Sequence, residues 1–249
     1  MHSDHNLNVY NTPKVVDHYA RLSKLNPCEN YAFGKFIPNG AAILDIGVGG
    51  GRTTPCLSAK ASYYLGIDYA VSMVEACQKR FPNLAFRCED ATNLQSISDD
   101  AFDVVVFSAN RIDYIPTDEG RRKCLAEAFR VIKPGGKLIF SSHNAKVLGV
   151  WPILEDVGIL KKTWRVLRAI GKTAQLATRQ LLANAFYAGK GYILDPEFGG
   201  FNIFTSTPAT MESEIRSAGF KPIEVVDLLY PQRLPKIFVG WYYYILVKP

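Results

Sequence analysis

The chain has 249 residues, enough for one large domain or one domain with an insertion, because a single hydrophobic core stops growing at roughly 250 to 300 residues. Its 48% hydrophobic composition indicates no long disordered region. Its five cysteines are odd in number, lie far apart and form no CxxC pair, so they indicate neither a disulfide framework nor a zinc knuckle. The net charge of +6 is local, because seven Lys or Arg residues and no acid lie between Asp156 and Asp195.

The first 142 residues predict helices alternating with strands. VVDHYARLSKL is typical of a helix and lies within a helical cap predicted over residues 1–39. From residue 40 onward, segments with helical periodicity separate five short apolar runs: AAILDI, SYYLGID, LAFRCED, FDVVVFS and GKLIFSS. This alternation indicates a parallel sheet with crossover helices.

The remaining residues break the alternation. Residues 145–204 predict a helical lid or substrate insertion, whose end, FYAGKGYILDPEFGGFNIFTSTP, has the glycines and aromatics of a pocket-lining or mobile segment. PATMESEIRSAG predicts a helix after Thr207, and KPIEVVDLLY and GWYYYILVK predict an antiparallel pair of strands. We therefore expect a single α/β domain over residues 1–249. Its seven-stranded, mostly parallel sheet should have helices on both faces and an antiparallel C-terminal edge strand.

The first predicted strand ends in a turn that is rich in glycine. Asp45 ends the strand, and glycine occupies four of the five positions from 47 to 51. Glycine has no Cβ, so the backbone of this turn can touch a ligand. The dinucleotide fingerprint G-x-G-x-x-G fails, because its sixth position is Arg52 when counted from Gly47 and Thr54 when counted from Gly49. No Gly-Lys-Ser/Thr follows, which excludes a P-loop.

The turn and its surroundings resemble the class I S-adenosylmethionine-dependent methyltransferases. Asp45, Gly47, Gly49 and Gly51 match the family's first motif, and YYLGIDYAVSMVEACQKR, CEDATNL, AFDVVVFS and AFRVIKPGGKLIFS resemble its later motifs in the same order. The resemblance covers residues 41–142 closely. It implies S-adenosylmethionine as cofactor and S-adenosylhomocysteine as product.

The resemblance also implies residues for cofactor binding. Asp68 should accept hydrogen bonds from both ribose hydroxyls, or else cap the next helix. Tyr69 and Met73 are expected to enclose the adenine, Asp90 and Ala91 to hydrogen-bond it, and Asp45 and Gly47 to lie near the methionine portion. Met73 could equally be core. Arg52 either pairs with the cofactor carboxylate or points into solvent, and Tyr19 either folds over that carboxylate or only packs its helix on the domain.

Acceptor residues are expected where the fourth and fifth strands end. His143 is a candidate general base, because histidine changes charge near neutral pH, or it simply bonds to the backbone. Asp113 is the second candidate base, or it fixes its loop. Asn110 should lie near the cofactor's methyl group. Arg111, Tyr114, Asn144 and Tyr230 are expected to contact the substrate. The histidines have no metal-ligand spacing, so no metal site is predicted.

Two stripes run side by side along the predicted insertion helix. One is apolar: Leu160, Trp164, Leu167, Gly171, Ala174 and Leu181. The other is basic: Lys161, Arg165, Arg168, Lys172 and Arg179. The basic stripe is either a solvated face or a surface for an anionic substrate, a carrier protein or a membrane.

These features favour a methyltransferase that acts on a small-molecule acceptor in biosynthetic or secondary metabolism, most simply on a hydroxyl or carboxylate oxygen. The alternatives are a nitrogen, peptide, carrier-bound or RNA acceptor docked on the basic helix, and a non-catalytic partner that binds S-adenosylmethionine. The resemblance disfavours methylation of an adenine nitrogen, because SANRID stands where an Asn-Pro-Pro-Tyr motif would follow the fourth strand, and we do not expect nucleic acid as a partner. No stretch has the roughly 20 apolar residues of a membrane span, and we expect a cytoplasmic protein. Nothing in the sequence specifies an oligomeric state.

Overall fold

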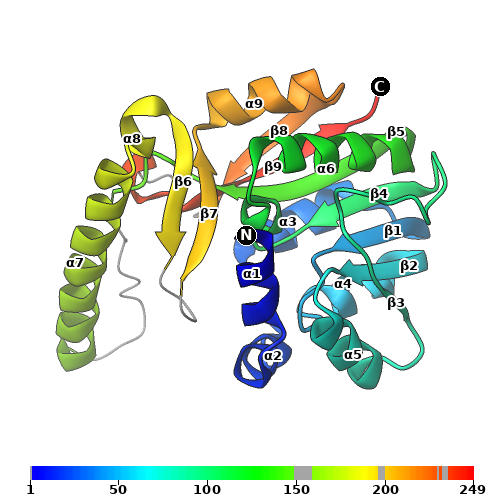
Figure 1. Cartoon of the computed structure of the whole chain (residues 1–249), viewed down its shortest axis with the longest axis horizontal. Helices are drawn as coiled ribbons and strands as arrows, with labels where there is room; N and C mark the ends of the chain where they lie inside the picture. Colours follow the sequence, from blue (N-terminus) through cyan, green and yellow to red (C-terminus); the bar gives the residue numbers. More distant parts are fainter. Residues whose placement is uncertain (1, 149–158, 196–199, 229, 232–234) are drawn as a thin grey trace.

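The computed structural model describes residues 2–148, 159–195, 200–228, 230–231 and 235–249. It contains a seven-stranded sheet in the order β3-β2-β1-β4-β5-β9-β8 (Figure 1). The strands are β1 (Ala41–Ile46), β2 (Ala61–Asp68), β3 (Ala85–Cys88), β4 (Phe102–Phe107), β5 (Ile132–His143), β8 (Lys221–Asp227) and β9 (Trp241–Val247). The first five are parallel, and β9 is antiparallel to both β5 and β8. The predicted fold class is confirmed, although β8 forms the edge and β9 lies one place inside it.

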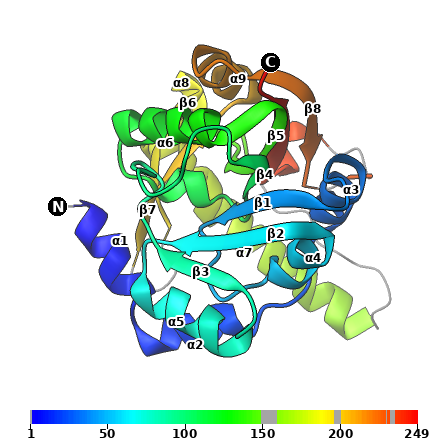
Figure 2. The ribbon, with the colours of Figure 1, turned by 90° about the vertical axis from the view of Figure 1, so that its right-hand side faces the viewer.

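Helices cover both faces of the sheet, because neighbouring residues of its buried strands point to opposite sides. Leu44 and Val105 pack in a cluster with residues of α6 (Asp118–Val131) and α9 (Pro208–Ser217). Ile43 and Val104 pack on the other face. The helices there are α3 (Pro27–Phe36), α4 (Thr54–Lys60) and α5 (Val71–Arg80). Figure 2 shows α6 and α9 on the opposite side of the sheet from α3 and α4.

A second, two-stranded sheet was not predicted. The segment expected to line a pocket or to be mobile instead forms the antiparallel strands β6 (Lys190–Asp195) and β7 (Phe201–Ser206). These strands form because they can bury alternate apolar side chains. Ile193, Phe201 and Ile203 are buried in one cluster with Tyr10 and Met73.

Helices at the N-terminus and in the insertion lie beside this small sheet. The N-terminal helices are α1 (His2–Tyr10) and α2 (Pro13–Ala20), and those of the insertion are α7 (Ile159–Leu182) and α8 (Ala185–Ala188). The His5 ring lies 2.8 Å from the Gly200 carbonyl oxygen, which joins α1 to the start of β7. In Figure 1, α1 lies near the hairpin and α7 stands at the far end of the molecule. That residues 1–39 act as a cap and 145–204 as a lid stays a prediction.

Candidate functional site

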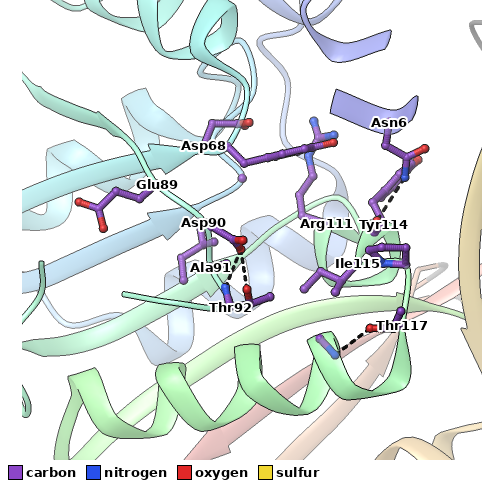
Figure 3. A pocket seen from close by; sticks show the side chains of 15 residues that line it. Asn6, Asp68, Glu89, Asp90, Ala91, Thr92, Arg111, Tyr114, Ile115 and Thr117 are labelled. Carbon is purple, nitrogen blue, oxygen red and sulfur yellow. Dashed lines mark hydrogen bonds between the residues drawn. The ribbon is translucent and has the colours of Figure 1, made fainter. Parts of the chain in front are cut away.

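A cavity of about 370 Å³ opens at the carboxyl ends of β1 and β2, where ligands bind in open α/β sheets. Its walls include Gly47, Asp68, Tyr69, Asp90 and Ala91 from the predicted cofactor residues, and Arg111 and Tyr114 from the predicted substrate residues. Asn6 of α1 closes one side, where its amide donates to the Tyr114 carbonyl oxygen (Figure 3). The volume is in the range of small-molecule sites.

Asp68 is held at the end of β2 by the backbone on both sides. Its Oδ2 accepts from the Gly49 amide at 2.8 Å and its Oδ1 from the Ala70 amide at 3.0 Å. Burial raises the pKa of this carboxyl, while these two amides and Arg111 act in the opposite direction. The strand end and the glycine turn therefore fix a carboxyl group in the cavity wall.

The glycine turn leaves room for the side chain of Arg111. A Cβ at Gly47 would lie 2.8 Å from Arg111 Cγ, and one at Gly49 would lie 2.9 Å from its Nη2. Both glycines have positive φ, +68° and +54°. The guanidinium carbon lies 5.5 Å from the centre of the Tyr10 ring and 4.7 Å from that of Tyr19, and Nη1 donates to the Tyr10 hydroxyl. Two aromatic rings and the turn thus enclose a cation.

The N-terminal segment closes directly on this turn. A Cβ at Gly50 would lie only 2.3 Å from the backbone carbonyl carbon of Tyr19. Tyr10, the last residue of α1 within the predicted cap, was missed as a site residue. No local signal marks it, because its place beside Arg111 depends on how α1 packs against residues a hundred positions away.

Asp113 and His143, expected as separate candidate bases, form a single pair. Asp113 lies in a short 3₁₀-helix, η1 (Arg111–Tyr114), and its Oδ2 is 2.7 Å from His143 Nδ1. The same carboxylate accepts from the His143 backbone amide and from the Ser142 hydroxyl, each at 2.7 Å. Asp113 is fully buried, whereas the His143 side chain is 19% exposed. The geometry gives a histidine oriented by a carboxylate.

The other ring nitrogen of His143 faces Asn110. The side-chain nitrogen Nδ2 of Asn110 lies 3.1 Å from His143 Nε2. The backbone N–H of Asn110 donates to the Ser141 hydroxyl. An ionised Asp113 can only accept, so Nδ1 is assigned the proton and Nε2 the lone pair. This is the arrangement in which an imidazole can take up a proton at Nε2.

Several buried polar atoms near this pair have no protein partner among the described residues. They are Ser108 Oγ, Asn110 Oδ1 and Trp241 Nε1. Trp241 stands opposite His143 in the register of β5 and β9, and the two rings are 6.2 Å apart. Leaving such groups unpaired costs about 1–3 kcal/mol each. Their chemistry suits an acceptor molecule with polar atoms. Ser108 was not predicted as a site residue.

Comparisons with known proteins agree with this architecture. The family model described as methyltransferase domain matches residues 43–136. Over 112 residues the chain is 29% identical to the demethylmenaquinone methyltransferase of Paenarthrobacter aurescens, covering 45% of this chain and 42% of that one. It is 27% identical over 135 residues to the ubiquinone biosynthesis O-methyltransferase of Idiomarina loihiensis, covering 51% and 53%. The matches thus span about half the length of these relatives.

A solved structure extends the likeness of fold to nearly the whole chain. An S-adenosylmethionine-dependent methyltransferase from Mesorhizobium loti superposes with a TM-score of 0.61 at 17% identity, covering 93% of this chain and 99% of that one. Residues 43–136 thus match a methyltransferase domain, and nearly the whole chain shares the fold of S-adenosylmethionine-dependent methyltransferases, which supports a class I enzyme of this kind. S-adenosylmethionine is the cofactor of this family.

Asp45 of the first motif and Arg52, which directly follows that motif, both have protein partners. Asp45 accepts from the Thr53 hydroxyl at 2.8 Å and the Tyr64 hydroxyl at 3.0 Å, and burial raises its pKa to about 6. Arg52, expected to meet either the cofactor or solvent, instead forms an ion pair of 2.5 Å with the buried Glu29 of α3. Its guanidinium therefore joins α3 to the glycine turn, next to a smaller cavity of about 40 Å³.

Four further predicted site residues contact other parts of the protein. Met73 is buried in the cluster with Tyr10 and does not line the cavity, so it is a core residue. The Asn144 amide donates to the Lys236 and Val239 carbonyl oxygens and fixes a loop. The Tyr230 ring packs on that of Tyr31 of α3 in a tilted arrangement, with ring centres 4.4 Å apart. Arg111 lies against the turn expected to hold the cofactor.

Among the described residues, no three His, Cys, Asp or Glu side chains group as metal ligands, and no helix is both long and apolar enough to cross a bilayer. The structure does not describe the side chains of Lys161 and Arg179 in the basic stripe or of Leu160 in the apolar stripe. Asp156 lies outside the described residues.

Proposed function

We propose that this methyltransferase moves the methyl group of S-adenosylmethionine to an oxygen of a small-molecule acceptor. The observation that favours oxygen is the pair of Asp113 and His143, since a hydroxyl must lose its proton when it becomes an ether or ester oxygen. The similarity to a ubiquinone biosynthesis O-methyltransferase supports the same chemistry. The free cysteines suit a reducing, cytoplasmic setting.

The cavity and the glycine turn fit the cofactor. When bound, S-adenosylmethionine supplies a methyl group that is electrophilic because it is attached to a positively charged sulfur. Asp68 is the group to accept from the ribose hydroxyls, while Asp90 and Ala91 line the side of the cavity proposed for the adenine. The enclosure of the Arg111 cation by Tyr10 and Tyr19 supports a site that accepts the positive charge of the cofactor's sulfur. Arg111 must leave the turn for a ligand to reach its backbone.

His143 acts as the general base in this proposal. Asp113 holds Nδ1 protonated and turns Nε2 toward Asn110, whose amide yields its place to the acceptor hydroxyl. The hydroxyl proton passes to Nε2 and leaves an oxygen nucleophile for the methyl group. The Asp113 carboxylate then stabilises the resulting imidazolium, as charge-assisted hydrogen bonds do. The roof formed by α1 and α2 keeps water away from the transfer.

The test is transfer of radiolabelled methyl groups by the full chain into a metabolite extract. We expect label in the small-molecule fraction, where mass analysis identifies the acceptor and the new methoxy group or methyl ester. His143→Gln and Asp113→Asn should each reduce kcat by about 10²-fold or more, with the affinity for S-adenosylhomocysteine unchanged. Label in protein or RNA, or full activity of His143→Gln, would contradict the proposal.

A pH readout separates a base from a structural role. Without His143, an acceptor hydroxyl reacts only when it has already ionised in solution. The kcat of His143→Gln should therefore keep rising with pH over a range where that of the parent is flat. Parallel pH profiles for the two proteins would mean that His143 only shapes the site.

A further inference from the structure

The helix α7 turns its large apolar side chains away from the rest of the protein. Trp164 is 59% exposed, Leu167 63% and Ile170 61%. Ala169, on the other side of the helix, is buried with a relative exposure of 7%. In Figure 1, α7 stands at the end of the molecule and reaches the rest through α8 and β6. We name Trp164, Leu167 and Ile170 the outer apolar face.

Cations flank the outer apolar face. Arg168 and Lys172 are exposed, and the Arg168 guanidinium carbon lies 5.1 Å from the centre of the Trp164 ring. The sequence of α7 contains six Lys or Arg residues and no acid over 24 positions. Long cationic side chains next to exposed Trp and Leu are typical of helices that lie in the headgroup region of a membrane.

The charge of α7 decides between the surfaces that could cover it. A second copy packed face to face would bring two helices without acids together, and their cations would repel each other. Insertion across a bilayer is excluded for the described residues, because no helix there is long and apolar enough. An anionic bilayer surface meets both requirements, since it buries the apolar side chains and neutralises the cations.

We propose that α7 docks this protein on the surface of an anionic lipid bilayer. The helix, about 36 Å long at 1.5 Å per residue, would lie in the plane of the interface with its outer apolar face in the lipid and its cations at the headgroups. The hairpin β6/β7, which packs with Tyr10 of α1, would then lie near the bilayer. This docking does not depend on the methyl-transfer chemistry.

The test is flotation of the full chain with vesicles of phosphatidylcholine alone or of phosphatidylcholine mixed with phosphatidylglycerol. We expect binding to the anionic vesicles, and much weaker binding to the neutral ones or at high salt. Leu167→Glu/Ile170→Glu and Arg168→Glu/Lys172→Glu should each lower the partition coefficient by more than about tenfold. All four side chains are exposed, so both variants should keep the parent's circular dichroism and affinity for S-adenosylhomocysteine.

Matched controls separate docking from a general surface effect. Ile223→Glu replaces an isoleucine that is 46% exposed on β8, and Lys79→Glu reverses an exposed lysine on α5. Both controls should bind anionic vesicles like the parent. Failure of the parent to bind them would overturn the proposal, as would equal loss in controls and α7 variants. It would also be overturned if the parent dimerised in sedimentation and Leu167→Glu/Ile170→Glu did not, because the face would then belong to a second copy.

Discussion

At the residue scale, the site depends on carboxylates whose positions the backbone fixes. Asp68 accepts from two amides, and Asp113 from one amide, one hydroxyl and one imidazole. Charge-assisted bonds of this kind are stronger than neutral ones and hold a rotamer in place. The chemistry of both groups is therefore set before any ligand arrives.

Asp68 should dominate binding of the cofactor. Asp68→Asn keeps an oxygen acceptor but loses the charge that strengthens bonds to the ribose hydroxyls. We expect the Kd for S-adenosylhomocysteine to rise by more than about tenfold, equivalent to about 1.4 kcal/mol, in calorimetric titration. Asp103→Asn, outside the cavity, is the control and should bind like the parent. Equal affinity of Asp68→Asn and the parent would remove the ribose assignment.

Asp45 should make the folded state less stable as pH rises through the acid range. Burial raises its pKa to about 6, so the folded protein binds this proton more tightly than the unfolded chain does. The free energy of unfolding should therefore fall as pH rises from about 4 to 6, by up to roughly 3 kcal/mol from this group. In Asp45→Asn, chemical denaturation should show a free energy of unfolding that no longer falls over this pH range.

Asp103 provides the opposite case. Lys133 and the Ala42 amide lower its pKa although partial burial opposes them, so it stabilises the fold above its unfolded pKa. That stabilisation is lost as pH falls through the lowered pKa. Asp103→Asn should therefore flatten the acid side of the stability profile. If Asp103→Asn also lost the fall in the free energy of unfolding between about pH 4 and 6 that we assign to Asp45, both assignments would be contradicted.

At the scale of elements, one buried arginine joins the small sheet to the large one. Arg121 of α6 is 1% exposed, and its guanidinium carbon lies 3.2 Å from the centre of the Phe204 ring of β7. Its nitrogens reach Glu214 of α9 and Asp118 of α6. This contact holds the hairpin β6/β7 against α6.

Removing that arginine should loosen the hairpin. Arg121→Met loses the ion pairs but keeps an apolar stem, and Asp118 and Glu214 are partly exposed to water. We expect a loss of about 2 kcal/mol in the free energy of unfolding and faster amide exchange in β6 and β7. Arg122→Met, at the exposed neighbouring position, should change neither quantity. Unchanged exchange in Arg121→Met would show that the apolar cluster alone holds the hairpin.

At the scale of the whole molecule, the cavity and α7 lie at different places and should respond to different ligands. The helices α1 and α2 close on the glycine turn, whereas α7 meets the rest mainly through α8 and β6. A ligand in the cavity stabilises the first region by mass action. A bilayer would cover the second.

Limited trypsin digestion should separate the two effects. S-adenosylhomocysteine should slow cleavage after Lys14 and Arg21 by more than about tenfold at saturating ligand, and leave cleavage after Arg168 and Lys172 unchanged. Anionic vesicles should give the reverse pattern. Protection of both regions by either ligand alone would mean that the cap and α7 move as one unit.

Local patterns were enough to predict much of the fold. Continuous apolar strands alternating with helical periodicity predicted the parallel sheet, and Thr207 and Pro208 predicted the start of α9. The hairpin β6/β7 was missed because its glycines resemble a loop, and its strands form only where their apolar faces meet α1.

The sequence by itself determined the glycine turn, Asp68 and the candidate bases, because each lies at a strand end that periodicity reveals. Only the tertiary structure decided that Asp113 and His143 form one pair, that Arg52 bonds to Glu29, and that Arg111 occupies the turn. These partners are far apart in the chain, and packing brings them together. The periodicity of α7 also appeared in the sequence, but only the fold shows that its apolar side faces outward.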